Sequence, residues 1–245
     1  MDKLTPMIRQ YLEIKGEHRD AILFFRLGDF YEMFFEDAEI ASRELGLALT
    51  TRDKRQDNPV PLCGVPHHAA SQYIAKLLKK GYKVAICEQV EDPRLARGIV
   101  KREVVRIITP GTDIETENIS PKAGNFLASV NPGRNSIGLA CVDLSTAEFR
   151  MTELPELEQL LEELLRVDPR EVLLPEGSEE FICSLKAALG GVLITERERK
   201  DFDYRSSQEL FQRMEIRGAE DEMKEGVGAA GAAVRYLQEL SLIHI

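Results

Sequence analysis

The segment from Ala21 to Leu27 most constrains how this chain can fold. It is an apolar run of strand length, and Asp20 and Gly28 bound it. Such a run is typical of a strand that is buried on both faces. We therefore expect a buried strand over 21–27.

Segments with helical signals lie before and after this strand in the sequence. Thr5 can cap a first helix, and Pro6 fits the first helical position. Asp29 is expected to open a second helix that runs through Leu45 and ends at Gly46. A third helix is expected over 67–80, strands over 47–51, 82–89 and 104–109, and a Pro-rich loop over 52–66. These elements predict a mixed α/β domain that ends near residue 110.

A second domain is expected after a polar linker. Segments 125–130, 137–144 and 147–154 are expected to form three strands of an antiparallel meander. Helices over 155–166 and 178–189 then alternate with strands over 171–174 and 192–195, and an Ala- and Gly-rich helix covers 226–240. This order predicts a ribonuclease-H-like layer of sheet and helices. The fold class is thus α/β: a mixed α/β domain followed by a ribonuclease-H-like α/β domain.

Charge is distributed unevenly along the chain. The formal net charge is −10, yet residues 1–112 hold 18 basic and 16 acidic side chains, whereas residues 113–245 hold 14 and 26. Within the first part, residues 52–106 carry a net charge of +6. A local basic face governs binding to phosphates even in an acidic chain. A solvated surface with scattered lysines is the alternative.

Several protein classes are not indicated by the sequence. The longest run of small and apolar residues, 227–234, is far shorter than the roughly 20 residues of a membrane span. The four cysteines lack the close spacing of zinc or redox motifs, which indicates reduced thiols in a cytoplasmic protein. There is no P-loop and no nucleophile elbow.

The densest motif is the aromatic segment over 24–35. Phe30 stands at the start of the expected helix, beside Gly28, where an exposed apolar side chain can insert between base pairs and unstack them. Glu32 is unfavourable beside phosphates but can reach a base edge. The alternative is structural: Phe34 belongs to an apolar helix stripe, and Asp29 with Glu32 has capping-box spacing.

Two other groups of residues leave their role open. The basic loop over 52–68 can bind phosphates or be an ordinary surface loop, and the adjacent His67 and His68 point apart on a helix, which disfavours a two-histidine metal site. Asp143 ends a strand where ribonuclease-H-type nucleases place a metal-binding carboxylate. Only Glu148 lies near it in sequence, so a turn-capping role is favoured over metal-dependent cleavage.

Five segments together resemble one family. The sequence RLGDFYEMF at 26–34, together with segments 4–12, 61–69, 85–89 and 104–112, is similar to the N-terminal part of the bacterial MutS family of mismatch-recognition proteins. The resemblance covers nearly the whole chain. It implies a mismatch-recognition domain over 1–112, a linker over 113–124 and a connector domain over 125–245 that ends at the start of the lever region.

The resemblance also implies a function and partners. Phe30 would stack on a mispaired base, Glu32 would hydrogen-bond that base, and Arg52, His68 and Arg102 would lie near the DNA backbone. The partners would be mismatched double-stranded DNA, MutL through the connector, and a second copy in the full-length protein, with a nucleoid-associated location in the cytoplasm. No cofactor is expected here, since ATP and Mg²⁺ belong to the family's ATPase domain, and this chain is expected to be a binding module rather than an enzyme. A nuclease and a purely structural fragment remain the rival hypotheses.

Overall fold

The chain folds into two compact units, Met1–Thr109 and Pro110–Ile245. The computed structural model describes residues 5–52, 59–91, 98–113, 124–215 and 223–240. The expected linker over 113–124 therefore lies almost wholly outside the described residues. None of the helices in these ranges is long and apolar enough to cross a membrane.

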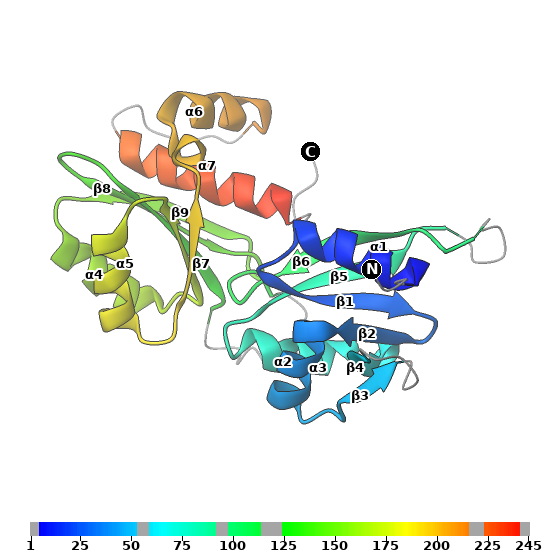
Figure 1. Cartoon of the computed structure of the whole chain (residues 1–245). Coiled ribbons are helices and arrows are strands. Elements are labelled where there is room, and N and C mark those ends of the chain that lie inside the picture. The colour runs from blue at the N-terminus through cyan, green and yellow to red at the C-terminus, as the bar shows by residue number, and fades with distance from the viewer. Residues whose placement is uncertain (1–4, 53–58, 92–97, 114–123, 216–222, 241–245) are drawn as a thin grey trace. The chain divides into compact units, whose positions relative to one another are not determined.

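The first unit is built on a six-stranded mixed sheet (Figure 1). Its strand order is β3-β4-β2-β1-β5-β6, and β1 and β5 form its parallel pair. The strands are β1 (Ala21–Leu27), β2 (Phe30–Phe34), β3 (Thr50–Arg52), β4 (Val60–Pro66), β5 (Lys83–Gln89) and β6 (Arg102–Ile108). The helices are α1 (Pro6–Glu17), α2 (Phe35–Leu45) and α3 (Ala70–Leu78), with a short 3-10 helix η1 (His67–Ala69).

Helices cover both faces of this sheet, as the buried strand β1 requires. Helix α1 packs on one face, where Tyr11 contacts Phe25 and Phe34 through edge-on ring contacts. Helices α2 and α3 pack on the other face, over Phe24 and Met33. The expectation of a buried strand over 21–27 is confirmed, since the first five residues of β1 are buried.

Two sequence-based expectations about this unit were wrong. Residues 30–34 form strand β2, and the helix begins at Phe35 rather than Asp29. Burial in β2 alternates with period two at its start, which suits a pleated strand, so Asp29 and Glu32 form no capping box. Residues 60–66, expected to be loop because of their prolines, form β4 and pair with both β2 and β3.

The second unit is a five-stranded sheet with helices on both faces. The strand order is β11-β10-β7-β8-β9, in which β7 to β9 form an antiparallel meander and β10 and β11 add in parallel. This confirms the ribonuclease-H-like prediction. The strands are β7 (Phe126–Pro132), β8 (Ile137–Asp143), β9 (Glu148–Leu154), β10 (Glu171–Pro175) and β11 (Leu193–Arg197), and the helices are α4 (Leu157–Val167), α5 (Glu179–Leu189), α6 (Tyr204–Arg213) and α7 (Lys224–Glu239), with a 3-10 helix η2 (Arg199–Phe202).

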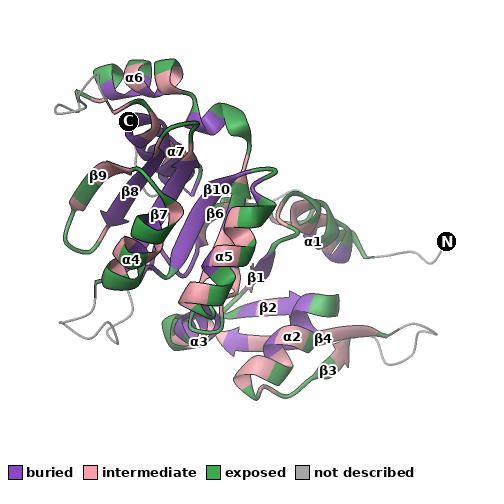
Figure 2. Ribbon diagram, turned by 90° about the vertical axis from the view of Figure 1, so that its left-hand side faces the viewer, coloured by how far each residue is buried: buried purple, intermediate pink, exposed green. Residues whose placement is uncertain are grey.

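Central strands of this sheet are buried along their length. Figure 2 shows β8 and β10 as buried, and every residue of both strands is in that class. Helices α4 and α5 pack on one face, whereas α7 packs on the other with α6 against it. Glycines permit the close approach of α7, because a Cβ at Gly138 of β8 would lie 2.0 Å from the carbonyl oxygen of Glu225.

Candidate nucleic-acid interface

A tight hairpin carries the aromatic motif. Strands β1 and β2 are joined by the two residues Gly28 and Asp29, so that Leu27 pairs directly with Phe30. Gly28 adopts a φ of +57°, which glycine tolerates and which hairpin turns of this length require at their first central position. Phe30 therefore projects from the tip of a hairpin rather than from a helix end.

Phe30 is the exposed aromatic residue of the first unit. Its relative exposure is 47 %, whereas the other eight aromatic residues of this unit, all of them described, are buried or partly buried. Its neighbours across the strands are Leu27 on one side and Pro66 on the other. An exposed phenylalanine at a rigid turn contributes little to the core, so its position is available for an external contact.

Glu32 shares the sheet face of Phe30. Residues i and i+2 of a strand point to one face and lie about 7 Å apart. Glu32 pairs with Gly64 of β4, and its Cγ lies 3.5 Å from the position that a Cβ at Gly64 would occupy. Because Gly64 lacks a side chain, the partly buried Glu32 can lie over that position. An apolar ring and a carboxylate thus project side by side from one strand.

A buried network fixes the root of this hairpin. The Asp37 carboxylate accepts hydrogen bonds from the Tyr11 hydroxyl at 2.7 Å and from the Leu23 amide at 3.0 Å, and it pairs with Lys15 at 2.9 Å. Phe35, at the junction of β2 and α2, has a φ of +54°, which is strained for a bulky residue. The network therefore lies at this junction, at the end of β2 opposite to Phe30.

The three expected backbone-contact residues differ in their placement. His68 is exposed in η1, which follows the β4 residue paired with Phe30. Arg52 ends β3 opposite Val60, and its side chain lies outside the described residues.

Arg102 has 6 % relative exposure. Its guanidinium donates to the carbonyl oxygens of Arg26 and Val100 and to the side chain of Gln10, and it lies 4.9 Å from the Phe25 ring centroid. Burial lowers the pKa of Arg102. The Arg102 guanidinium is thus engaged within its own unit, and its expected contact with the DNA backbone stays a prediction.

Among the described basic residues of 52–106, the three lysines around the end of α3 lie away from the hairpin. Lys76, Lys79 and Lys80 lie at the C-terminal end of α3. The 3-10 helix η1 precedes α3 and directly follows Pro66, the residue that pairs with Phe30. Lys80 pairs with Glu44 at 2.8 Å. Residues 53–58 and 92–97, which carry four further basic residues, are outside the described part. The described cations therefore support only a modest attraction to phosphates.

In the described part of the second unit, Asp143 and Glu148, the carboxylates of the rival nuclease hypothesis, do not form a metal centre. Asp143 has 1 % relative exposure and accepts hydrogen bonds from the amide nitrogens of Asn125 and Ser145 and from the Ser145 hydroxyl. Glu148 forms an ion pair with Arg150. Within the described ranges no group of three or more His, Cys, Asp or Glu side chains could hold a metal ion. Asp143 therefore caps its own turn, which is the structural role that the sequence favoured.

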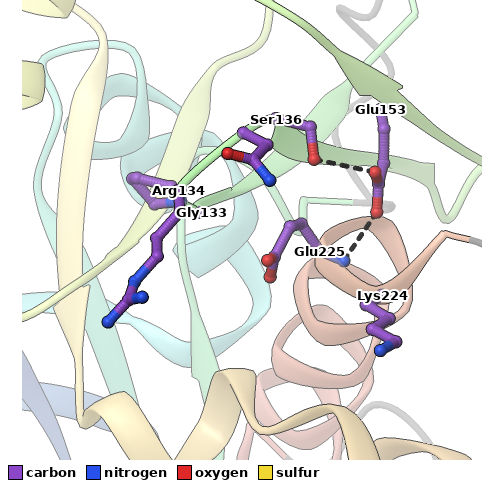
Figure 3. A pocket seen from close by; sticks show the side chains of 8 residues that line it. Gly133, Arg134, Ser136, Glu153, Lys224 and Glu225 are labelled. Atoms are coloured by element: carbon purple, nitrogen blue, oxygen red, sulfur yellow. Dashed lines mark hydrogen bonds between the residues drawn. The ribbon is translucent and has the colours of Figure 1, made fainter.

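An open hollow of about 710 Å³ lies where the β7–β8 turn meets the start of α7 (Figure 3). Glu153 caps this helix, because its carboxylate accepts from the amides of Glu225 at 2.6 Å and Gly226 at 3.1 Å, and Ser136 donates to its other oxygen at 2.8 Å. Burial foremost, and then the charge of Glu153, raises the pKa of Glu225. The Ser136 hydroxyl and the Glu153 carboxylate of the hollow are thus engaged within the unit.

Comparison with known proteins decides the family. A model of MutS domain I matches residues 5–117, and a model of MutS domain II matches residues 125–244. The chain belongs to the MutS family. The six-stranded unit corresponds to MutS domain I and the ribonuclease-H-like unit to MutS domain II.

Curated relatives carry the name DNA mismatch repair protein MutS. The chain is 46 % identical over 244 residues to the protein of Desulfatibacillum aliphaticivorans. This alignment covers 97 % of the present chain and 27 % of the relative. The chain is 47 % identical over 258 residues to that of Symbiobacterium thermophilum, covering 99 % and 29 %. For Desulforamulus reducens the identity is 58 % over 175 residues, covering 70 % and 20 %. The chain therefore spans between a fifth and a third of the length of these MutS relatives.

Proposed function

We propose that this chain recognises mismatched double-stranded DNA in mismatch repair, and that the β1–β2 hairpin of MutS domain I is the reading element. The observation that carries this proposal is the 47 % exposure of Phe30, which stands alone among the nine aromatic residues of its unit. The names of the MutS relatives supply the biological process.

Phe30 acts as an apolar wedge in this proposal. A phenyl ring that inserts from the minor groove must unstack a base step, which costs a few kcal/mol in a matched duplex and less at a mispaired or unpaired base. The turn at Gly28 and Asp29 is narrow, so the hairpin tip can approach a groove closely. Selectivity then arises because a mismatch lowers the cost of insertion.

Glu32 reads the displaced base. Its carboxylate would accept a hydrogen bond from a base edge, and its charge would be repelled by the phosphates of a continuous duplex. His68 and Arg52 would contribute contacts to the DNA backbone beside the hairpin. Glu32 thus adds discrimination at the cost of affinity for matched DNA.

The partners of this chain would be the remaining domains of the full-length protein and a second repair protein, MutL. We propose that MutS domain II relays the recognition event to the lever and ATPase domains of the longer protein, where ATP and Mg²⁺ act, and docks MutL, and that the full-length protein works as a homodimer associated with the nucleoid.

The test compares a duplex that carries a one-base bulge with the matched duplex, by fluorescence titration at 50 and 150 mM salt. We expect affinity on the order of micromolar or weaker, falling as salt rises, and a preference for the bulge. Phe30→Ala should abolish this preference. Phe149→Ala, which removes an exposed phenylalanine of the second unit, is the matched control and should retain it.

Glu32→Gln separates the two roles of the motif. It keeps hydrogen-bonding groups and removes the charge, so affinity for matched DNA should rise while the preference for the bulge falls. Full preference in Phe30→Ala, or loss of preference in Phe149→Ala alone, would place the reader elsewhere in the chain.

A further inference from the structure

The turn that presents Phe30 is braced from the sheet face opposite to Phe30. Pairing of β1 with β5 ends at Phe25, so the tip of the hairpin extends beyond its parallel neighbour. Two carbonyl oxygens at this tip are nevertheless engaged. The Arg26 Nε donates to the Gly28 oxygen at 2.6 Å, and the His67 amide donates to the Asp29 oxygen at 2.8 Å.

Arg26 is itself held in place by two side chains. Its Nη1 lies 3.7 Å from the Glu88 carboxylate, and its guanidinium carbon lies 5.5 Å from the centre of the Tyr31 ring. The Tyr31 hydroxyl donates to the same oxygen of Glu88. Burial foremost, and then the hydrogen bond with Glu88, raises the pKa of Tyr31, so this hydroxyl remains a donor at neutral pH. The contacts that hold the Arg26 guanidinium therefore join three strands, β1, β2 and β5.

Alternation along the hairpin puts Arg26 on the other face from the reading residues. Arg26 pairs with Tyr31 in register, and Tyr31 packs with the core on the α2 and α3 side, whereas Phe30 is the next residue and points the opposite way. The Arg26 side chain is only 18 % exposed. It is placed to hold the turn rather than to contact what Phe30 contacts.

We propose that Arg26, held by Glu88 and Tyr31, is a positioning residue that fixes the orientation of Phe30 before DNA binds. This inference rests on the proposed function. It gives Arg26, which does not itself contact the DNA, a part in selectivity beside Phe30 and Glu32. A wedge that is already ordered loses less conformational entropy on insertion than a mobile one. Arginine suits this role because its planar, forked guanidinium can stack on Tyr31 and donate to Gly28 together.

The absence of tryptophan from the chain permits a direct test. Phe30→Trp introduces a single tryptophan at the hairpin tip, whose fluorescence anisotropy reports the order of the turn without DNA. In this background we compare Arg26→Lys, Arg26→Ala and Glu88→Gln. Arg43→Ala is the control, because Arg43 is an exposed arginine of the same unit that pairs with Glu44 away from the hairpin.

We expect Arg26→Ala to lower the anisotropy of Trp at position 30 most, Arg26→Lys nearly as much despite its retained charge, and Glu88→Gln by an intermediate amount. Arg43→Ala should leave it unchanged. With Phe30 restored, the preference for a bulged duplex should fall about three- to tenfold in Arg26→Lys, which is the effect expected when one charge-assisted hydrogen bond is weakened. Circular dichroism at the same temperature checks that each variant is folded.

Unchanged anisotropy in both Arg26 variants would overturn the inference. Unchanged anisotropy together with equal loss of affinity for bulged and matched DNA would also overturn it, and would assign Arg26 to a phosphate contact. The measurement without DNA also separates the two proposals. If the parent chain shows no preference for the bulge, the proposed function fails. The anisotropy measured without DNA still tests whether Arg26 orders the hairpin tip.

Discussion

Tyr11 of α1 donates its hydroxyl hydrogen to Asp37 of α2 across 2.7 Å, and both side chains are buried. Burial foremost, and then the charge of Asp37, raises the pKa of Tyr11, so the tyrosine remains the donor at neutral pH. The same carboxylate also pairs with Lys15 at 2.9 Å. One acidic group therefore links the N-terminal helix to the junction that follows the β1–β2 hairpin.

Removal of this charge should destabilise the first unit. Asp37→Asn leaves the Lys15 ammonium beside a neutral amide, and loss of one partner of a buried ion pair costs about 3–5 kcal/mol of unfolding free energy. Asp20→Asn breaks the Asp20–Lys83 pair, whose carboxylate is 71 % exposed, and should cost about 1 kcal/mol or less. Urea unfolding measures both variants. Equal effects would mean that the buried network contributes no more than a surface pair.

Close packing of α7 gives a second prediction. A Cβ at Gly138 would lie 2.0 Å from a backbone oxygen of α7, which cannot move aside as a flexible side chain could, so Gly138→Ala should destabilise the second unit by about 3 kcal/mol or more. Gly16, within α1, has no atom within 4 Å of the same position. Gly16→Ala should therefore stabilise the chain by about 0.5–1 kcal/mol. Thermal unfolding distinguishes them, and a tolerated Gly138→Ala would contradict the close approach.

The sequence predicted most elements of the second unit because its local signals agree with its fold. The meander strands alternate with turn residues, and the five-stranded order follows from a helix between each later pair of strands. In the first unit, Thr5 caps α1, with the Ile8 amide 3.4 Å from its hydroxyl, and Gly46 ends α2 with a φ of +69°. Such caps are encoded within a few neighbouring residues.

The second strand of the β1–β2 hairpin was mistaken for a helix because two local signals compete there. Asp29 and Glu32 have capping-box spacing, whereas the dipeptide Gly28-Asp29 between two apolar runs is itself a hairpin signal. Pairing of β2 with both β1 and β4 settles the conformation, and this depends on Gly64, which lies 32 residues after Glu32 in the sequence. The sequence alone suggests the proposed roles of Phe30 and Glu32, whereas the contacts of Arg26 with Glu88 and Tyr31 emerge only from the tertiary structure.

Glu225 gives a prediction about pH. The raised pKa of its carboxyl means that the folded state binds this proton more tightly than the unfolded state. The ionised form therefore opposes folding above the raised pKa, and this penalty disappears as the pH falls through it toward the ordinary value near 4.5. Glu225→Gln should raise the melting temperature by a few degrees at most at pH 7, and the gain should vanish near pH 4.

Glu162→Gln is the control for this prediction, because it removes an equal charge from an exposed position of α4. It should show little change at either pH. A gain in Glu225→Gln that persists at pH 4 would indicate a cause other than the carboxylate charge.

Phe30 and Phe34 provide the sharpest comparison between the proposed wedge residue and a core residue. Both lie on the same face of β2, yet Phe30 is 47 % exposed and Phe34 is fully buried, with its ring 5.0 Å from that of Tyr11. Phe34→Ala should lower the unfolding free energy by about 3–5 kcal/mol because it leaves a cavity. Phe30→Ala leaves none, so its melting temperature should stay close to that of the parent chain while the preference for bulged DNA is lost. A large loss of stability in Phe30→Ala, with that preference retained, would make Phe30 a structural residue and would remove the wedge from the mechanism.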